Sequence, residues 1–177
     1  MQFTKDSFYM ALLQRMTSLY PLQTITLNGT TRPAIVVAEN EPVIPIVPLP
    51  DAFYLEWGIA QPVAQQSGNR MLLGMDCLIT HHTFGSTDSG FDRGRSLTNL
   101  DLELLAICQP QYTSKLDYTQ TPAANLGTNI FWTPPQFGEI TGSEALRNEG
   151  LLRGDEGVRL ERTAKLRVFF FSEVTVL

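Results

Sequence analysis

The feature that most constrains this sequence is the alternation of apolar and polar side chains near its C-terminal end, from Val158 to Val174. A period of two predicts a long strand of an antiparallel sheet with one buried face. Arg162 is the one charged residue on the apolar side. From Val168 to Phe171 both sides are apolar, which indicates that helices or another subunit cover both faces at this end.

A second long segment, from Arg70 to Cys108, predicts a strand, a polar turn and a helix. The strand, Arg70 to Phe84, exceeds the usual length of about 5–6 residues. Gly74 within it predicts a bulge or a bend, because glycine in a strand interior commonly marks such an irregularity. Ala52 to Ile59 predicts an aromatic-rich strand that pairs with it in a hairpin.

The helix of this segment begins near Asp88 or Ser89, both good N-caps, and ends before Pro110. Asp101 and Glu103 are predicted on its outer, solvated side. Helical spacing predicts a buried apolar stripe made of Leu97, Leu100, Leu104 and Ile107.

The N-terminal segment predicts an amphipathic helix from Lys5 to Tyr20, with Thr4 as its N-cap. Two short strands follow, Thr24 to Leu27 and Ala34 to Ala38. Asn28-Gly29 lies between them and is a strong hairpin signal, because both residue types accept positive φ. The apolar stripe of the helix consists of Phe8, Leu12, Met16 and Leu19.

Residues 39–51 form a proline-rich arm, with prolines at positions 42, 45, 48 and 50. Such a segment is extended and cannot join the centre of a sheet. Its intervening residues are apolar, so we expect the arm to lie in a groove on its own subunit or on a neighbour. Val43, Ile44 and Ile46 are therefore candidate contact residues.

Residues 109–157 are rich in proline and glycine, and the sequence predicts a long loop excursion there. The segment is also rich in aromatic residues, which predicts an ordered excursion that partly covers the domain and partly reaches a partner. Phe131 and Trp132 are candidate contact residues, and residues 143–149 predict a short helical turn.

Together these elements predict one domain over residues 1–177, of the α+β class, with a mostly antiparallel sheet and two main helices packed on one face. Charged residues make up only 18% of the chain, against about 25% in ordinary domains. This low share fits surface covered by another subunit, and it fits equally a surface of uncharged polar residues. The net charge of −5 argues against a general nucleic-acid binder.

The sequence contains no motif that identifies a reaction. His81 and His82 are the only histidines, and adjacent strand residues point to opposite faces, so they do not share a metal ion in regular geometry. Cys77 and Cys108 are predicted to be reduced core thiols. We therefore expect no catalytic residue, no metal and no cofactor. No signal peptide or membrane span is evident, so cytoplasmic synthesis is expected.

Three segments resemble the tail terminator, or tail-completion, proteins of long-tailed bacteriophages and prophages. They are the opening helix DSFYMALLQRM, the strand–turn–helix unit DCLITHHTFGSTDSGFDRGRSLTNLDLELLAI and the closing strand RTAKLRVFFFSEV. The second segment contains an aromatic-x-Arg-x-Arg helix start, which is Phe91, Arg93 and Arg95 here. The resemblance covers less than half of the chain and lies in pattern and order.

The resemblance implies a structural protein that catalyses nothing. Such proteins form a ring, typically a hexamer, that ends the tail tube and joins it to the neck or head. Expected partners are further copies of the chain, the tail tube protein and a neck or head-completion protein, with DNA passing through the ring. Expected locations are the host cytoplasm during assembly and then the virion. Phe91, Arg93 and Arg95 are candidate subunit contacts.

Three alternatives remain open. The chain can be another neck or minor tail component. It can be a small-molecule hydrolase that uses His81 or His82, which requires one of these rings in a pocket beside a serine, cysteine or carboxylate. It can also be a binding module that recruits partners through the proline-rich arm.

Overall fold

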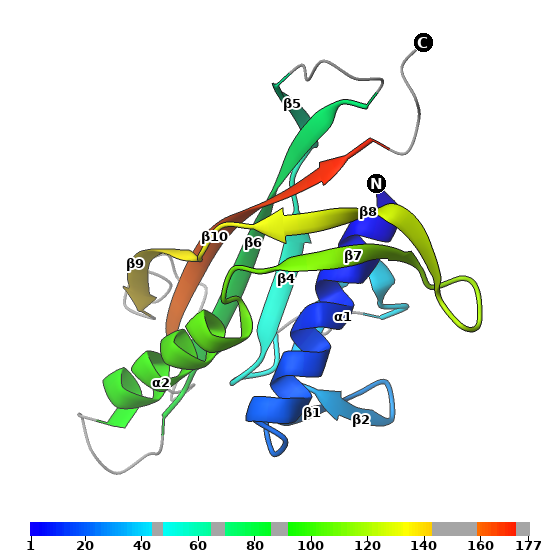
Figure 1. The fold of residues 1–177 in the computed structure, drawn as a ribbon. Helices are drawn as coiled ribbons and strands as arrows, with labels where there is room; N and C mark the ends of the chain where they lie inside the picture. The colour runs from blue at the N-terminus through cyan, green and yellow to red at the C-terminus, as the bar shows by residue number, and fades with distance from the viewer. Residues whose placement is uncertain (44–47, 65–69, 86–91, 143–158, 173–177) are drawn as a thin grey trace.

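The structure is a computed structural model that describes residues 1–43, 48–64, 70–85, 92–142 and 159–172 (Figure 1). In chain order its elements are α1 Gln2–Leu19, β1 Thr24–Leu27, β2 Thr30–Pro33, β3 Ile35–Val37, the 3₁₀ helix η1 Ala38–Asn40, β4 Phe53–Trp57, β5 Gln61–Ala64, β6 Leu72–Thr83, α2 Asp92–Ile107, β7 Tyr112–Asp117, β8 Ala124–Trp132, β9 Gln136–Gly142 and β10 Leu160–Phe171.

Eight of the described strands form one sheet, in the order β3-β4-β6-β10-β8-β7, with β5 paired to β6 and β9 paired to β10. Every pairing in it is antiparallel except that of β3 with β4. β6 and β10 form the central pair of the sheet. Their pairing is continuous from Leu160–Thr83 to Phe171–Leu72. The predicted α+β class with a mostly antiparallel sheet is confirmed.

The sheet curls around α1, so that β7 and β8 cross the helix in Figure 1. The ring of Phe8 on α1 meets Trp57 of β4 at 5.5 Å and Trp132 of β8 at 5.0 Å, both edge to face. The Phe8 side chain therefore contacts strands on both sides of the curled sheet. We call the sheet face that carries α1 and α2 the inner face, and the opposite one the outer face.

The predicted alternation along the last strand is confirmed. Its buried residues Ala164, Leu166, Val168 and Phe170 all lie on the inner face. The stripe of α2 is also confirmed, since Leu97, Leu100, Leu104 and Ile107 are all buried.

The N-terminal helix begins earlier than predicted. It starts at Gln2, and the backbone N–H groups of Thr4 and Lys5 both donate to the carbonyl of Met1. Thr4 is fully buried within the first turn, so the prediction that it is the N-cap is wrong. The apolar stripe is correct for Phe8, Leu12 and Met16, which are all fully buried; Leu19, the fourth member, is 53% exposed at the helix end.

The predicted hairpin turn is right, but its second strand is not the one expected. Asn28 and Gly29 have φ of 50° and 77°, as such a turn requires. β1 pairs with β2, whereas Ile35–Val37 forms β3 and pairs in parallel with β4. A parallel pair needs a crossover connection, and the proline-rich arm supplies it. At its C-terminal end the N–H of Leu49 donates to the Tyr54 hydroxyl at 2.6 Å.

Gly74 does not mark a bulge in the pairing of β6 with β10, where it lies opposite Phe169 in continuous register. A Cβ there would stand 2.5 Å from Nε of Arg167 and 2.9 Å from Cγ2 of Val63. The glycine therefore makes room for two side chains of neighbouring strands.

The predicted loop excursion is largely sheet. Residues 109–142 contain β7, β8 and β9, and the prolines that suggested a loop lie in the connections between them. Pro122 follows β7, and Pro134 and Pro135 separate β8 from β9. The density of proline and glycine in this stretch favours a loop, although side chains along β8 alternate between less and more exposed, as in a strand. The helical turn predicted over 143–149 lies outside the described residues.

Candidate functional site

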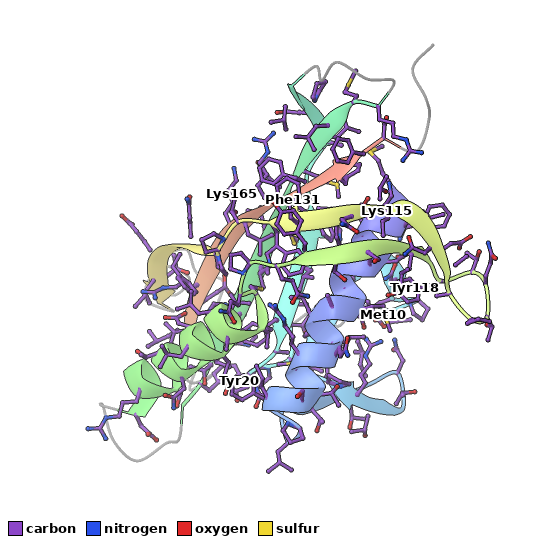
Figure 2. All side chains as sticks on the ribbon, viewed as in Figure 1. Met10, Tyr20, Lys115, Tyr118, Phe131 and Lys165 are labelled. Atoms are coloured by element: carbon purple, nitrogen blue, oxygen red, sulfur yellow. The ribbon has the colours of Figure 1, made fainter. Side chains whose placement is uncertain are left out.

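The outer face of the sheet carries a row of three aromatic rings, one on each of three neighbouring strands. Phe131 of β8 and Phe169 of β10 are direct cross-strand neighbours and stack at 4.9 Å with 15° between their planes. Tyr112 of β7 lies opposite Phe131, with ring centroids 5.3 Å apart. Phe131, which is labelled in Figure 2, is the middle residue of the three by strand register. We call these three residues the aromatic row.

Charged side chains border the aromatic row on β6 and β10. The guanidinium of Arg167 lies 6.0 Å from the ring of Phe169, and its Nε is 3.9 Å from Asp76. Lys165, also labelled in Figure 2, contacts the same carboxylate at 2.8 Å and is 55% exposed. Leu78 lies opposite Lys165 and is 39% exposed. The outer face is therefore an accessible mixture of aromatic, aliphatic and charged groups.

Such a mixture suits a protein partner. Tyr112 is 75% exposed although it is a large aromatic residue. Tyrosine, phenylalanine and arginine are enriched in protein interfaces, and the residues with the largest contributions to binding are commonly tyrosine and arginine. The aromatic row and its borders are thus our candidate interaction surface.

A groove of about 590 Å³ runs between α1 and β7, on a different part of the molecule. Figure 2 labels two residues that line it, Met10 and Tyr118. Burial raises the pKa of Tyr118. No histidine, cysteine, carboxylate or cationic side chain is among the residues that line the groove.

A buried cluster of three side chains joins α2 to the sheet, and we call it the His81 cluster. Nε2 of His81 lies 2.8 Å from one carboxylate oxygen of Asp101, and Nη1 of Arg162 donates to the other at 2.5 Å. His81 and Arg162 are direct cross-strand neighbours on the inner face. The predicted outward position of Asp101 is therefore wrong, because its carboxylate turns inward to these two partners.

This cluster also explains why Arg162 interrupts the apolar side of its strand. Burial lowers the pKa of His81, although the hydrogen bond to Asp101 acts in the opposite direction. The imidazole is fully buried, so the ring is not accessible to a substrate. The cluster holds a helix in place and offers no exposed nucleophile.

The other titratable candidates are buried as well. His82 is only 1% exposed, and burial together with Arg159 lowers its pKa. Cys77 and Cys108 are free thiols in the core, as predicted, and burial raises the pKa of both. Among the described residues, no group of three or more histidine, cysteine or acidic side chains is placed to hold a metal ion.

The predicted contact residues are scattered over the structure. Phe131 lies in the aromatic row. Val43 is 65% exposed on the proline-rich arm, and Arg95 is exposed on the first turn of α2. Arg93 is half-buried and lies close to Gly85. Phe91, Ile44 and Ile46 lie outside the described residues.

Among the candidates that the structure describes, Trp132 is the one whose side chain belongs to the core. It is 3% exposed, and its indole N–H donates to the carbonyl of Cys108 at 2.9 Å. Because Trp132 follows Phe131 on a strand, the two point to opposite faces, and only Phe131 reaches the outer one. Its side chain therefore has no free surface for a partner.

Sequence reasoning missed Tyr112, Phe169 and Arg167. The alternation of the last strand contained a signal for two of them, because Arg167 and Phe169 occupy its outward positions. Tyr112 carried no such signal, since its strand was interpreted as part of a loop.

No protein-family model matches this sequence, and no match was found among curated proteins. Of the described helices, neither is long and apolar enough to cross a membrane.

Proposed function

We propose that this chain is a structural protein of bacteriophage or prophage tail assembly, which forms a ring that ends the tail tube and joins it to the neck or head. Its partners are further copies of itself, the tail tube protein and a neck or head-completion protein. It acts without catalysis, in the host cytoplasm during assembly and then in the virion. Another neck or minor tail role is the closest alternative.

The observation that carries the proposal is the aromatic row on the outer face. An exposed tyrosine beside two stacked phenylalanines, bordered by Arg167, Lys165 and Asp76, favours binding to a protein. Tail proteins work by contact with neighbouring subunits, so an accessible surface of this kind fits the role. The resemblance in element order is our reason for proposing tail assembly in particular. The outer face is the surface that we propose for the contacts with neighbouring subunits.

No observation favours the hydrolase alternative. It requires a histidine beside a serine, cysteine or carboxylate in a pocket that admits a substrate, and His81 and His82 are both buried in the core, where His81 contacts the carboxylate of Asp101. The described groove, between α1 and β7, is lined without histidine.

The test measures oligomeric state and binding to tube protein. The chain has a mass of 19.8 kDa, so light scattering coupled to size exclusion reports the number of subunits directly. We expect a ring at tens of micromolar, either alone or after addition of tail tube protein, and ring-shaped particles by negative-stain microscopy. A chain that stays monomeric at this concentration and does not bind tube protein contradicts the proposal.

Variants locate the contact surface. Tyr112→Ser and Phe131→Ser each remove part of the aromatic row and are expected to weaken assembly by tenfold or more, about 1.4 kcal/mol or above. Leu22→Ser is the matched control, because Leu22 is 94% exposed in the connection between α1 and β1, away from the row. Equal weakening by all three variants would point to a general loss of solubility and not to a contact surface.

A further inference from the structure

The His81 cluster attaches α2 to the sheet through polar groups. Asp101 stands on the inward side of the helix, between buried Leu97 and Leu104, and its two oxygens bind His81 of β6 and Arg162 of β10. One carboxylate thus joins three elements. Whatever changes the charge of this cluster changes how firmly the helix is held.

One ring nitrogen of His81 has a hydrogen-bond partner, and the other has none among the described residues. Because the Asp101 carboxylate accepts, Nε2 carries the proton in the neutral ring, and Nδ1 is an acceptor. Nδ1 is buried and has no hydrogen-bond partner among the described residues. Phe53 and Phe137 flank the ring, with centroids at 5.5 and 6.4 Å. A second proton would place a buried N–H donor where no acceptor is found among the described residues.

The charged groups around His81 do not remove the free-energy cost of adding a second proton to the buried ring. Asp101 on α2 favours the protonated ring, as does Glu161 on β10. Arg162 on β10 opposes protonation, and its positive charge already occupies the second oxygen of the carboxylate. His82, next in the strand, is the remaining titratable neighbour on β6. Burial is the largest of all these influences, and it lowers the pKa of His81.

We propose that the His81 cluster is an acid-released latch, which holds α2 on the sheet at neutral pH and lets it open when His81 takes up a proton. In the closed state the ring stays neutral within its aromatic walls. When α2 moves away, the ring reaches water and binds a proton at its ordinary affinity. Acid therefore favours the open state by mass action.

Opening of the latch would uncover apolar surface. The stripe of α2, Leu97, Leu100, Leu104 and Ile107, is buried in the closed state. Its release would present these side chains, and the inner-face residues beneath them, to a partner or to solvent. This inference concerns α2 and the inner face, and it holds whether or not the outer face binds other subunits.

Hydrogen exchange of the full chain tests the latch. With an ordinary histidine pKa of about 6.5 in the open state, lowering the pH from about 7.5 to about 5.5 multiplies the opening equilibrium by at most about tenfold, the limit in which the closed state binds no proton. Amide protection along α2, corrected for intrinsic exchange rates, should fall by up to this factor. The chain has only two histidines, so single variants separate their contributions.

His81→Gln keeps a neutral donor for Asp101 but does not titrate, so its α2 protection should be independent of pH over this range. His82→Gln is the matched control, because it removes the other buried histidine and leaves the cluster intact; its α2 protection should fall as in the parent chain. Equal α2 protection at both pH values in the parent chain overturns the proposal, and so does an undiminished fall in His81→Gln.

A second measurement serves if His81→Gln does not fold. Histidine ring resonances of the parent chain, assigned with His82→Gln, report when His81 gains its proton. The latch predicts that His81 gains its proton only as α2 protection is lost. A His81 titration completed while α2 remains fully protected overturns it.

Discussion

Arg167 of β10 lies directly over Gly74 of β6, so that a Cβ at this glycine would stand 2.5 Å from the guanidinium Nε. The close approach fixes where the Arg167 side chain runs on the outer face, beside Phe169 and Asp76. The absence of a side chain at one position thus places the cation that borders the aromatic row.

Gly74→Ala should therefore destabilise the protein by about 1 kcal/mol, because overfilling a packed site costs about 1–3 kcal/mol and the arginine end can partly give way. Gly94→Ala is the matched control. A Cβ at Gly94, in the first turn of α2, meets nothing within 4 Å, and alanine is favoured over glycine in helices by about 0.5–1 kcal/mol. Urea unfolding should show opposite signs for the two variants; the same sign for both would contradict the packing argument.

Removal of the Asp101 carboxylate should be far more costly than removal of a surface charge. Asp101→Ala leaves His81 and Arg162 without their shared partner, and breaking a buried charged pair costs about 3–5 kcal/mol. Because Arg162 is 21% exposed, we expect about 3 kcal/mol. The comparison is Lys165→Ala, which breaks the exposed pair with Asp76 and should cost less than about 1 kcal/mol. Similar losses of stability in both variants would show that the His81 cluster stabilises the fold no more than an exposed ion pair does.

The stability of the whole chain should fall as the pH drops below about 6.5. The pKa of His81 and that of His82 are both lowered in the folded state, chiefly by burial. The unfolded chain then binds more protons than the folded one, so each histidine contributes stability that is fully present above the ordinary histidine pKa and is lost as pH falls toward its lowered value. The slope is at most about 1.4 kcal/mol per pH unit for each histidine.

The double variant His81→Gln with His82→Gln should flatten this dependence between about pH 7.5 and about pH 5.5. Urea midpoints measured at several pH values for the parent chain and the variant give the comparison. A parent chain whose midpoint does not move in this range would mean that neither histidine titrates differently on folding.

The two cysteines should not react in the folded chain. Cys77 and Cys108 are fully buried, and burial raises the pKa of each thiol, so very little thiolate forms at neutral pH. A thiol reagent should label neither residue in native buffer and both in concentrated urea. Rapid labelling of the native chain would show that the core around Cys77 opens readily.

Several elements were predictable because they depend on local periodicity. The last strand, the stripe of α2 and the turn at Asn28-Gly29 each follow from residue spacing or from the φ that a residue type accepts. The segment from 109 to 142 was not predictable in the same way. It is rich in proline and glycine, with Pro122, Pro134 and Pro135 between its strands and Gly127 and Gly138 within them, so its local composition is that of a loop.

The candidate surface depended on long-range pairing. Tyr112, Phe131 and Phe169 come from three strands, and only the register of β7, β8 and β10 brings their rings together. The position of Asp101 was missed for a related reason. On a helix an acidic residue beside an apolar stripe is normally solvated, and its inward turn depends on partners that lie 20 and 61 residues away.

By itself, the sequence determined the fold class, the two helices with their apolar stripes and the one-sided burial of the last strand, since helical and strand periods encode which face is buried. Only the tertiary structure decided which strands are neighbours, that the proline-rich arm connects a parallel pair, and that an arginine on an apolar strand face meets a carboxylate there. These features depend on contacts between distant residues, whose free energies arise only once the chain has folded and are not written in any local pattern.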